Sequence, residues 1–170
     1  MSQSEYLPYG RQTIDDDDIN AVIEVLRSDW LTTGPKVSEF EQVFAEFIGT
    51  TEAVAVSSGT AALHASMHAL GISQGDEVIL SPLTFVSSAN CVVFEGGTPV
   101  FADVDPNTLL LDPKKVASKI TPLTKAIIAV HLYGHAADVI KLKKICKVRN
   151  IKLIEDCAEA LGTYLKGKQV

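Results

Sequence analysis

The sequence has 170 residues, with 15 Lys and Arg against 21 Asp and Glu, a formal net charge of −6. Hydrophobic residues make up 46% of the chain and charged residues 21%, which is typical of a globular protein and excludes a disordered one. The acidic balance argues against a nucleic-acid partner, because such binders cluster Lys and Arg. No apolar run approaches the ~18 residues of a membrane span, and the first ten residues do not resemble a secretory signal. The three cysteines lack zinc-pair spacing, so we expect reduced thiols in a cytoplasmic protein without a metal site.

The first predicted elements are two amphipathic helices. One follows the acidic run Asp15 to Asp18, which complements a helix N-terminus, and the other covers residues 37–49. A loop at 31–35 separates them. No low-complexity linker follows, so we expect a single structural unit with an N-terminal helical segment at 1–50 and an α/β part at 51–170.

Short runs rich in Val, Ile and Ala predict the strands of the α/β part. These runs lie at 52–57, 77–81, 99–104, 125–132 and 151–156. They are continuous rather than alternating, which is typical of parallel strands that are buried on both faces. Helix-like stretches separate or follow them, at 60–71, 85–97, 112–120 and 137–150. The alternation predicts a doubly wound, mostly parallel α/β sheet, and residues 163–170 are predicted to form a hairpin.

Three motifs follow predicted strands. Small residues at 57–63 open a helix whose free N–H groups and positive end suit an anion; the alternative is a plain structural turn. Phe85 follows the second strand and could stack on a flat ligand or pack in the core. Asp156 ends the fifth strand, where it could pair with a protonated ring nitrogen or simply cap a helix. If the strand persists, Glu155 points to the opposite face. Together the motifs suit a planar, phosphorylated nitrogen heterocycle.

The histidines and Cys157 carry weaker signals. His131 ends the fourth strand and is either a site residue or a satisfied structural one. His64 and His68 share a helix face without a third ligand nearby, which argues against a metal. Cys157 has no paired base, so we do not expect a nucleophile there.

Several longer stretches resemble the DegT/StrS family of nucleotide-sugar aminotransferases, which has the fold type I pyridoxal-phosphate architecture. The matching segments are LTTGPKVSEFE (31–41), AVSSGTAALH (55–64), GDEVILSPLTFVSSAN (75–90), GGTPVFADVDPNT (96–108), ITPLTKAIIAVHLYG (120–134) and IEDCAEALGTYLKGK (154–168). The resemblance implies an incomplete large domain that binds pyridoxal 5'-phosphate, in a homodimer. It implies transfer of an amino group from an amino acid such as glutamate to a nucleotide-linked keto-sugar.

The resemblance also implies roles for individual residues. Gly59 and Thr60 match the residues that hold the cofactor phosphate, and Phe85 matches the aromatic that stacks on the ring. Asp156 matches the carboxylate that pairs with the pyridinium nitrogen. Further matches, near the ring hydroxyl or the substrate, are Glu159, where relatives usually have Gln or His, and Thr33, Gly34 and His131.

The lysine that forms the Schiff base in the family has no counterpart among these 170 residues. Lys166 and Lys168 match a variable hairpin instead. We therefore expect this chain to be the N-terminal part of such an enzyme, without the small C-terminal domain and inactive alone. Two alternatives stay open: a sugar dehydratase relative, in which His replaces the lysine, and a non-catalytic remnant that binds phosphate compounds.

Overall fold

A computed structural model describes residues 10–170 of the chain. The first nine residues, which carry most of the stretch in which we expect no secretory signal, lie outside the described part. The chain divides into two compact units, one ending at Ala55 and one beginning at Val56, and each is described by itself. No helix among the described residues is long and apolar enough to cross a membrane.

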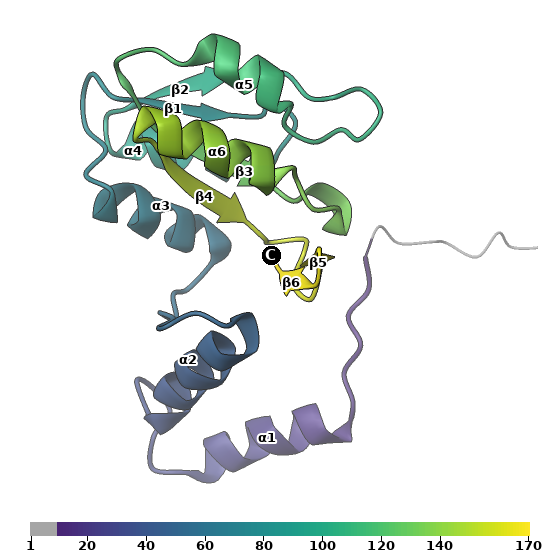
Figure 1. Cartoon of the computed structure of the whole chain (residues 1–170). Coiled ribbons are helices and arrows are strands. Elements are labelled where there is room, and N and C mark those ends of the chain that lie inside the picture. The colour runs from purple at the N-terminus through teal and green to yellow at the C-terminus, as the bar shows by residue number, and fades with distance from the viewer. Residues whose placement is uncertain (1–9) are drawn as a thin grey trace, which may run out of the picture. The chain divides into compact units, whose positions relative to one another are not determined.

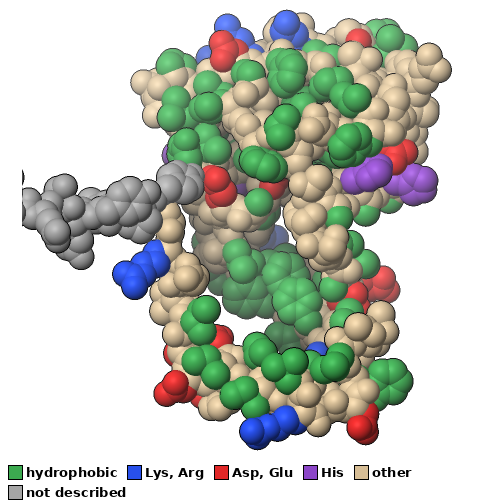
Figure 2. Space-filling view, turned by 180° about the vertical axis from the view of Figure 1, so that it is seen from behind, with side chains coloured by type: hydrophobic (Ala, Val, Ile, Leu, Met, Phe, Trp, Pro, Cys, Tyr) green, Lys and Arg blue, Asp and Glu red, His purple; other side chains and the backbone are tan. Residues whose placement is uncertain are grey.

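The first unit contains helices α1 (Asp16–Arg27) and α2 (Pro35–Ile48). Asp15 caps α1: its carboxylate accepts the N–H groups of Asp17 and Asp18, and the Asp18 side chain accepts the N–H of Asp15. The acidic run therefore starts a helix, as predicted. Hydrophobic side chains gather on the surface of these helices (Figure 2). The large ones on α1 are exposed at Ile19, Val22 and Leu26, and those on α2 at Val37, Phe40, Val43 and Phe47.

The second unit is built on a four-stranded parallel sheet (Figure 1). Its strands are β1 (Glu77–Leu80), β2 (Thr98–Phe101), β3 (Thr124–Val130) and β4 (Lys152–Asp156), in the order β2-β1-β3-β4. All three neighbouring pairs are parallel. This confirms the predicted α/β class and four of the five predicted strands.

The predicted strand at 52–57 is wrong. The backbone there is not assigned to a strand, and Val54 is 78% exposed. A strand forms only where a neighbour exchanges backbone hydrogen bonds with it, and no described segment does so here. The N–H of Ala55 donates instead to the Glu41 side chain, 2.8 Å away. Hydrophobicity was therefore insufficient without a pairing partner.

Four helices cover both faces of the sheet: α3 (Gly59–Ala69) precedes β1, and α4 (Ser87–Phe94), α5 (Pro113–Lys119) and α6 (Val139–Arg149) connect successive strands (Figure 1). Val78, Leu80 and Ile128 pack on the side of α3 and α4, whereas Ile79 and Ile127 pack on the side of α5 and α6. Successive strand residues thus point to opposite faces, and each face has its own core. The strands read as continuous apolar runs because both faces are covered.

Two smaller elements complete the second unit. A 3-10 turn, η1 (Leu132–Gly134), follows β3. The chain closes with an antiparallel hairpin of β5 (Tyr164–Leu165) and β6 (Lys168–Gln169), which confirms the predicted hairpin.

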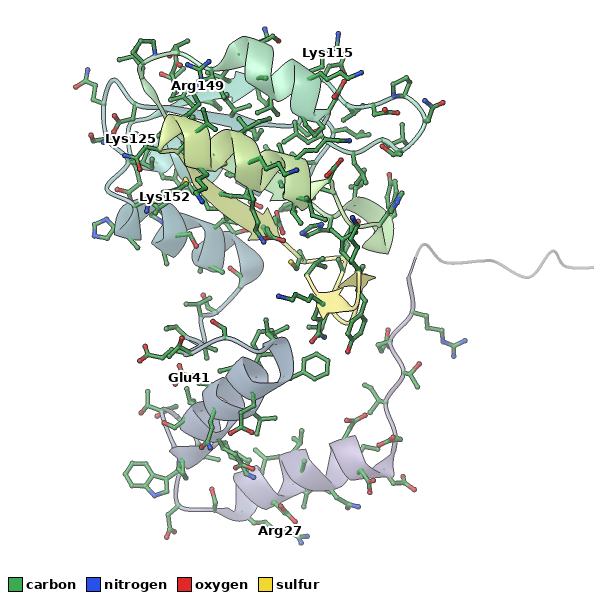
Figure 3. The ribbon with its side chains drawn as sticks, viewed as in Figure 1. Arg27, Glu41, Lys115, Lys125, Arg149 and Lys152 are labelled. Atoms are coloured by element: carbon green, nitrogen blue, oxygen red, sulfur yellow. The ribbon has the colours of Figure 1, made fainter. Side chains whose placement is uncertain are left out.

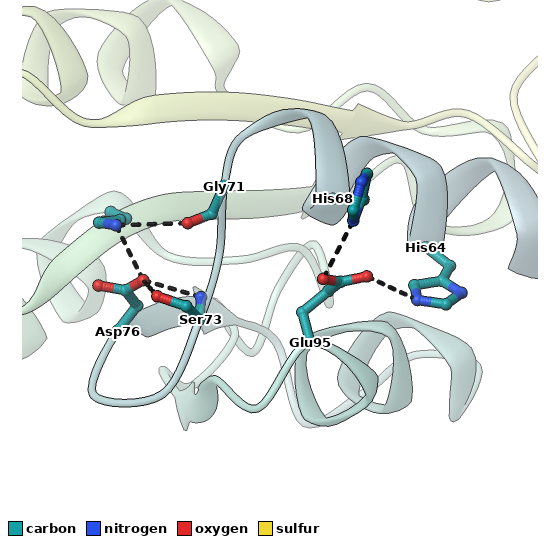
Figure 4. Close-up of polar contacts among 7 residues, drawn as sticks. His64, His68, Gly71, Ser73, Asp76 and Glu95 are labelled. Carbon is teal, nitrogen blue, oxygen red and sulfur yellow. Dashed lines mark hydrogen bonds and ion pairs between the residues drawn. The ribbon is translucent and has the colours of Figure 1, made fainter.

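The amino ends of the strands form one edge of the sheet. Lys125 and Lys152 lie there, at the starts of β3 and β4 (Figure 3). The Lys125 ammonium pairs with Asp76 at 2.8 Å and donates to the Gly71 carbonyl at 3.4 Å (Figure 4). Because Gly71 lies two residues beyond the end of α3, that helix ends near the amino ends of the strands. At 1.5 Å per residue α3 is roughly 16 Å long, so its first turn is directed toward the carboxyl edge.

Candidate functional site

Asp156 is the last residue of β4, at the carboxyl edge of the sheet. Its side chain is half-buried and points to the face covered by α3 and α4, where Ile154 also packs. One carboxylate oxygen, Oδ2, accepts a hydrogen bond from the hydroxyl of Ser88 on α4 at 3.3 Å, and Oδ1 accepts the N–H of Ala158 at 3.2 Å. An ionised carboxylate has further lone pairs for a cationic ligand atom.

Phe85 lies in the loop between β1 and α4, just before the helix begins. Its ring is 72% exposed, so it does not belong to the core. The Phe85 carbonyl accepts a hydrogen bond from the N–H of Ser88 at 3.1 Å. The Phe85 backbone and the Asp156 carboxylate are therefore both hydrogen-bonded to Ser88. An exposed aromatic side chain can present its face to a flat ligand.

The first turn of α3 carries backbone donors without a protein acceptor. Ser58 caps the helix: its hydroxyl accepts the N–H of Ala61 at 3.1 Å, and its carbonyl accepts the N–H of Ala62. Within the described part of the chain, the N–H groups of Gly59 and Thr60 have no hydrogen-bond acceptor. A Cβ atom added at Gly59 would meet nothing within 4 Å. Open space and free donors at a helix N-terminus suit an anion.

His131 is fully buried, and both of its ring nitrogens are engaged within the protein. Nδ1 accepts the N–H of Ala137 at 2.9 Å, so Nε2 carries the proton and faces Glu155 at 3.3 Å. This geometry favours the structural alternative for His131 over a contact with substrate, because no ring nitrogen is left to bind a ligand.

Glu155 points to the opposite face of the sheet from Asp156, as the strand periodicity predicted. Its carboxylate contacts His131 and forms an ion pair with Lys143 on α6 at 2.8 Å. The hydrogen bond from His131 is the main reason why the pKa of Glu155 falls from 4.5 to about 2; burial opposes this change, and Lys143 adds to it. The two adjacent acids therefore differ in role. Glu155 is engaged by His131 and Lys143 and stabilises the fold, whereas Asp156 at the end of β4 can still accept a hydrogen bond from a ligand.

Glu159 is exposed, and its Oε2 accepts the N–H of Tyr133 in the turn after β3 at 2.8 Å. Tyr133 has a positive φ of 56°, so the side chain of Glu159 fastens a turn that an L-residue rarely adopts. Its expected role beside a ring hydroxyl stays a prediction.

Thr33 and Gly34 belong to the first unit, in the loop between α1 and α2. Thr33 has a φ of 48°, and a Cβ atom at Gly34 would lie 2.7 Å from Cβ of Trp30. The glycine is therefore explained by the close approach of Trp30. The expected substrate role of both residues stays a prediction.

The remaining candidates carry no catalytic feature. Glu95 accepts from His64 at 2.8 Å and from His68 at 3.3 Å (Figure 4), yet no cluster of described residues is arranged to hold a metal ion. Burial raises the pKa of Cys157 to about 11, with the charges of Glu155 and Asp156 adding to the effect, so its thiol is a poor nucleophile.

Sequence reasoning missed Ser88 and its neighbour Thr84. The hydroxyl of Ser88 is buried between Asp156 and Thr84, 2.9 Å from Thr84 Oγ1. Both residues lie in the segment SPLTFVSSAN, but serine and threonine are common in loops and helix starts. Only the contact across 68 positions of sequence distinguishes them.

The fold and these residues define a parallel α/β protein with free backbone N–H groups at the start of α3, an exposed aromatic after β1 and a half-buried acid at the end of β4. The sequence pattern of the DegT/DnrJ/EryC1/StrS aminotransferase family matches residues 12–170. The chain belongs to this family, and its fold is part of the fold type I architecture.

Solved structures of aminotransferases superpose on the chain. One from Psychrobacter cryohalolentis is 38% identical, with a TM-score of 0.90 over 96% of this chain and 42% of that one. DesV from S. venezuelae, solved with a ketimine intermediate, is 38% identical, with a TM-score of 0.87 over 89% of this chain and 41% of that one. The putative sugar aminotransferase Spr1654 from Streptococcus pneumoniae, in its PLP form, is 32% identical, with a TM-score of 0.90 over 96% and 45%. The chain thus spans less than half the length of these relatives.

Proposed function

We propose that this chain forms the pyridoxal-phosphate-binding part of a sugar aminotransferase. The observation on which the proposal rests lies at the carboxyl ends of the strands, where the Asp156 carboxylate is hydrogen-bonded to Ser88 and the Phe85 side chain is exposed. The free N–H groups at the start of α3 suit a phosphate. The relatives in their PLP form and with a ketimine intermediate support this choice of cofactor.

Each residue has a physical task in this proposal. The N–H groups of Gly59 and Thr60 and the Thr60 hydroxyl hold the phosphate. Phe85 covers one face of the ring and excludes water from it. Asp156 stabilises the proton on the ring nitrogen, because an adjacent carboxylate favours the charged form. Pyridoxal phosphate then supplies the electron sink that the transfer of an amino group requires.

The complete reaction moves an amino group from an amino acid, with glutamate as the first candidate, to a nucleotide-linked keto-sugar. This part of the proposal concerns the assembled enzyme, as does its homodimeric state. The three free cysteines support a reducing, cytoplasmic compartment.

Within these 170 residues, we propose that pyridoxal phosphate binds without a Schiff base. The two lysines nearest the end of the chain lie in the terminal hairpin: Lys166 occupies the turn and Lys168 starts β6. A catalytic lysine must reach the cofactor as covalent partner and as base. The chain alone therefore binds the cofactor and does not turn over.

Titration of the 170-residue chain with pyridoxal phosphate, followed by borohydride reduction and mass spectrometry, tests this function. We expect pyridoxal phosphate to bind saturably and inorganic phosphate to compete with it. After reduction, we expect no single lysine to carry a covalent adduct. Thr60→Val and Asp156→Asn should weaken binding, whereas Thr98→Val, at the start of β2, should not. A single-site lysine adduct would contradict the non-covalent mode, and absence of saturable binding by a folded chain would contradict the site itself.

A further inference from the structure

Ser88 connects two parts of the candidate site. Its side chain is completely buried, its hydroxyl donates to Asp156 Oδ2 at 3.3 Å, and its N–H donates to the Phe85 carbonyl at 3.1 Å. One residue in the first turn of α4 is therefore bonded to the acid at the end of β4 and to the backbone of the exposed aromatic.

The hydroxyl of Ser88 is supported in turn by Thr84. The two hydroxyl oxygens are 2.9 Å apart. Ser88 has a single hydroxyl proton, and it donates that proton to Asp156 Oδ2. Thr84 is then the donor to Ser88. The result is a directed chain from Thr84 through Ser88 to Asp156, in which each bond polarises the next.

We propose that Ser88, supported by Thr84, is a positioning residue that holds the Asp156 carboxylate in the orientation required for a pyridinium partner. The identity of that partner rests on the proposed function. The hydrogen bond from the Ser88 hydroxyl fixes the position of Asp156 Oδ2. The hydrogen bond from the Ser88 N–H to the Phe85 carbonyl holds the backbone of Phe85 in a fixed position relative to Ser88.

The contact between Ser88 and Asp156 can be tested without any cofactor. We would record the side-chain carboxyl carbon signal of Asp156 by NMR in the 170-residue chain, assigned with Asp156→Asn. Ser88→Ala should move the signal, and Ser88→Thr, which keeps a hydroxyl, should restore most of the original value. Ser87→Ala is the matched control: Ser87 is the preceding residue, is 6% exposed, and makes no side-chain hydrogen bond among the described residues. It should leave the signal unchanged.

Cofactor binding gives a second measurement. With pyridoxal phosphate as the probe, Ser88→Ala should weaken binding roughly tenfold, the loss expected for one hydrogen bond to a charged group. Ser88→Thr, which keeps a hydroxyl, should restore most of the affinity, a rescue that a role in packing alone would not produce. Thr84→Val should act in the same direction more weakly, and it serves as the test if Ser88→Ala does not fold.

An Asp156 signal unchanged in both Ser88→Ala and Thr84→Val would overturn the proposal. So would an affinity for pyridoxal phosphate that Ser88→Ala leaves equal to that of the wild-type chain. If the NMR signal responds but pyridoxal phosphate does not bind, the proposed function fails while the link between Ser88 and Asp156 stands. The two ideas are thus separable.

Discussion

Replacing Glu155 by Gln tests the division of labour between the two adjacent acids. The Glu155 carboxylate is held by His131 and Lys143, and its side chain is 22% exposed. The hydrogen bond from His131 is the largest cause that lowers its pKa, from 4.5 to about 2. This lowering of the Glu155 pKa corresponds to about 3 kcal/mol of unfolding free energy at neutral pH. The value is an upper one, since the Gln side chain can keep part of the hydrogen bond from His131.

The sign of this contribution follows from linkage. A carboxylate with a lowered pKa in the folded state stabilises the fold above the unfolded value of 4.5, and the stability is lost as the pH falls toward about 2. Urea unfolding followed by circular dichroism, at pH values from 7 to 2, measures both effects. Glu155→Gln should lower the unfolding free energy by up to about 3 kcal/mol at pH 7 and flatten its decline between pH 4.5 and 2.

Asp103→Asn is a suitable control in the same unit. Asp103 is exposed, and among residues 10–170 its side chain accepts a hydrogen bond only from the N–H of the next residue, Val104. It should change the unfolding free energy by less than about 0.5 kcal/mol. If Glu155→Gln behaves like this control and keeps the acid-dependent slope of the wild type, the assignment of Glu155 to stability is refuted.

Three further changes address the packing of the second unit. Leu142→Ala should lower the free energy of unfolding by about 2–5 kcal/mol, because Leu142 is fully buried. Its control, Val148→Ala on the same helix, changes an 82% exposed position and should lower it by less than about 0.5 kcal/mol. Equal losses in the two variants, measured by chemical unfolding, would contradict the orientation of α6. Gly97→Ala should lower the melting temperature, since the added Cβ atom would lie 2.7 Å from Cγ2 of Ile72. An unchanged melting temperature would show that the Ile72 side chain can move away from the added methyl group. Ser58→Ala should destabilise by about 1 kcal/mol through loss of the α3 cap, and a stability equal to wild type would argue against the cap.

Much of the fold followed from local pattern. Continuous apolar runs such as 125–132 predicted buried parallel strands, and the helix-like stretch at 112–120 predicted α5, which the structure has at Pro113–Lys119. The alternation along β4 also predicted that Glu155 and Asp156 face opposite sides. These signals are local because side-chain periodicity and capping involve residues close in sequence.

The sequence by itself determined the α/β class, the family resemblance, and Phe85 and Asp156 as candidates after their strands. Only the tertiary structure decided that residues 52–57 find no strand partner within residues 10–170, that both ring nitrogens of His131 are engaged, and that Ser88 reaches Asp156. The physical reason is the same in each case. Pairing, burial and long-range hydrogen bonds depend on which distant segments become neighbours, and no local pattern of residues specifies that.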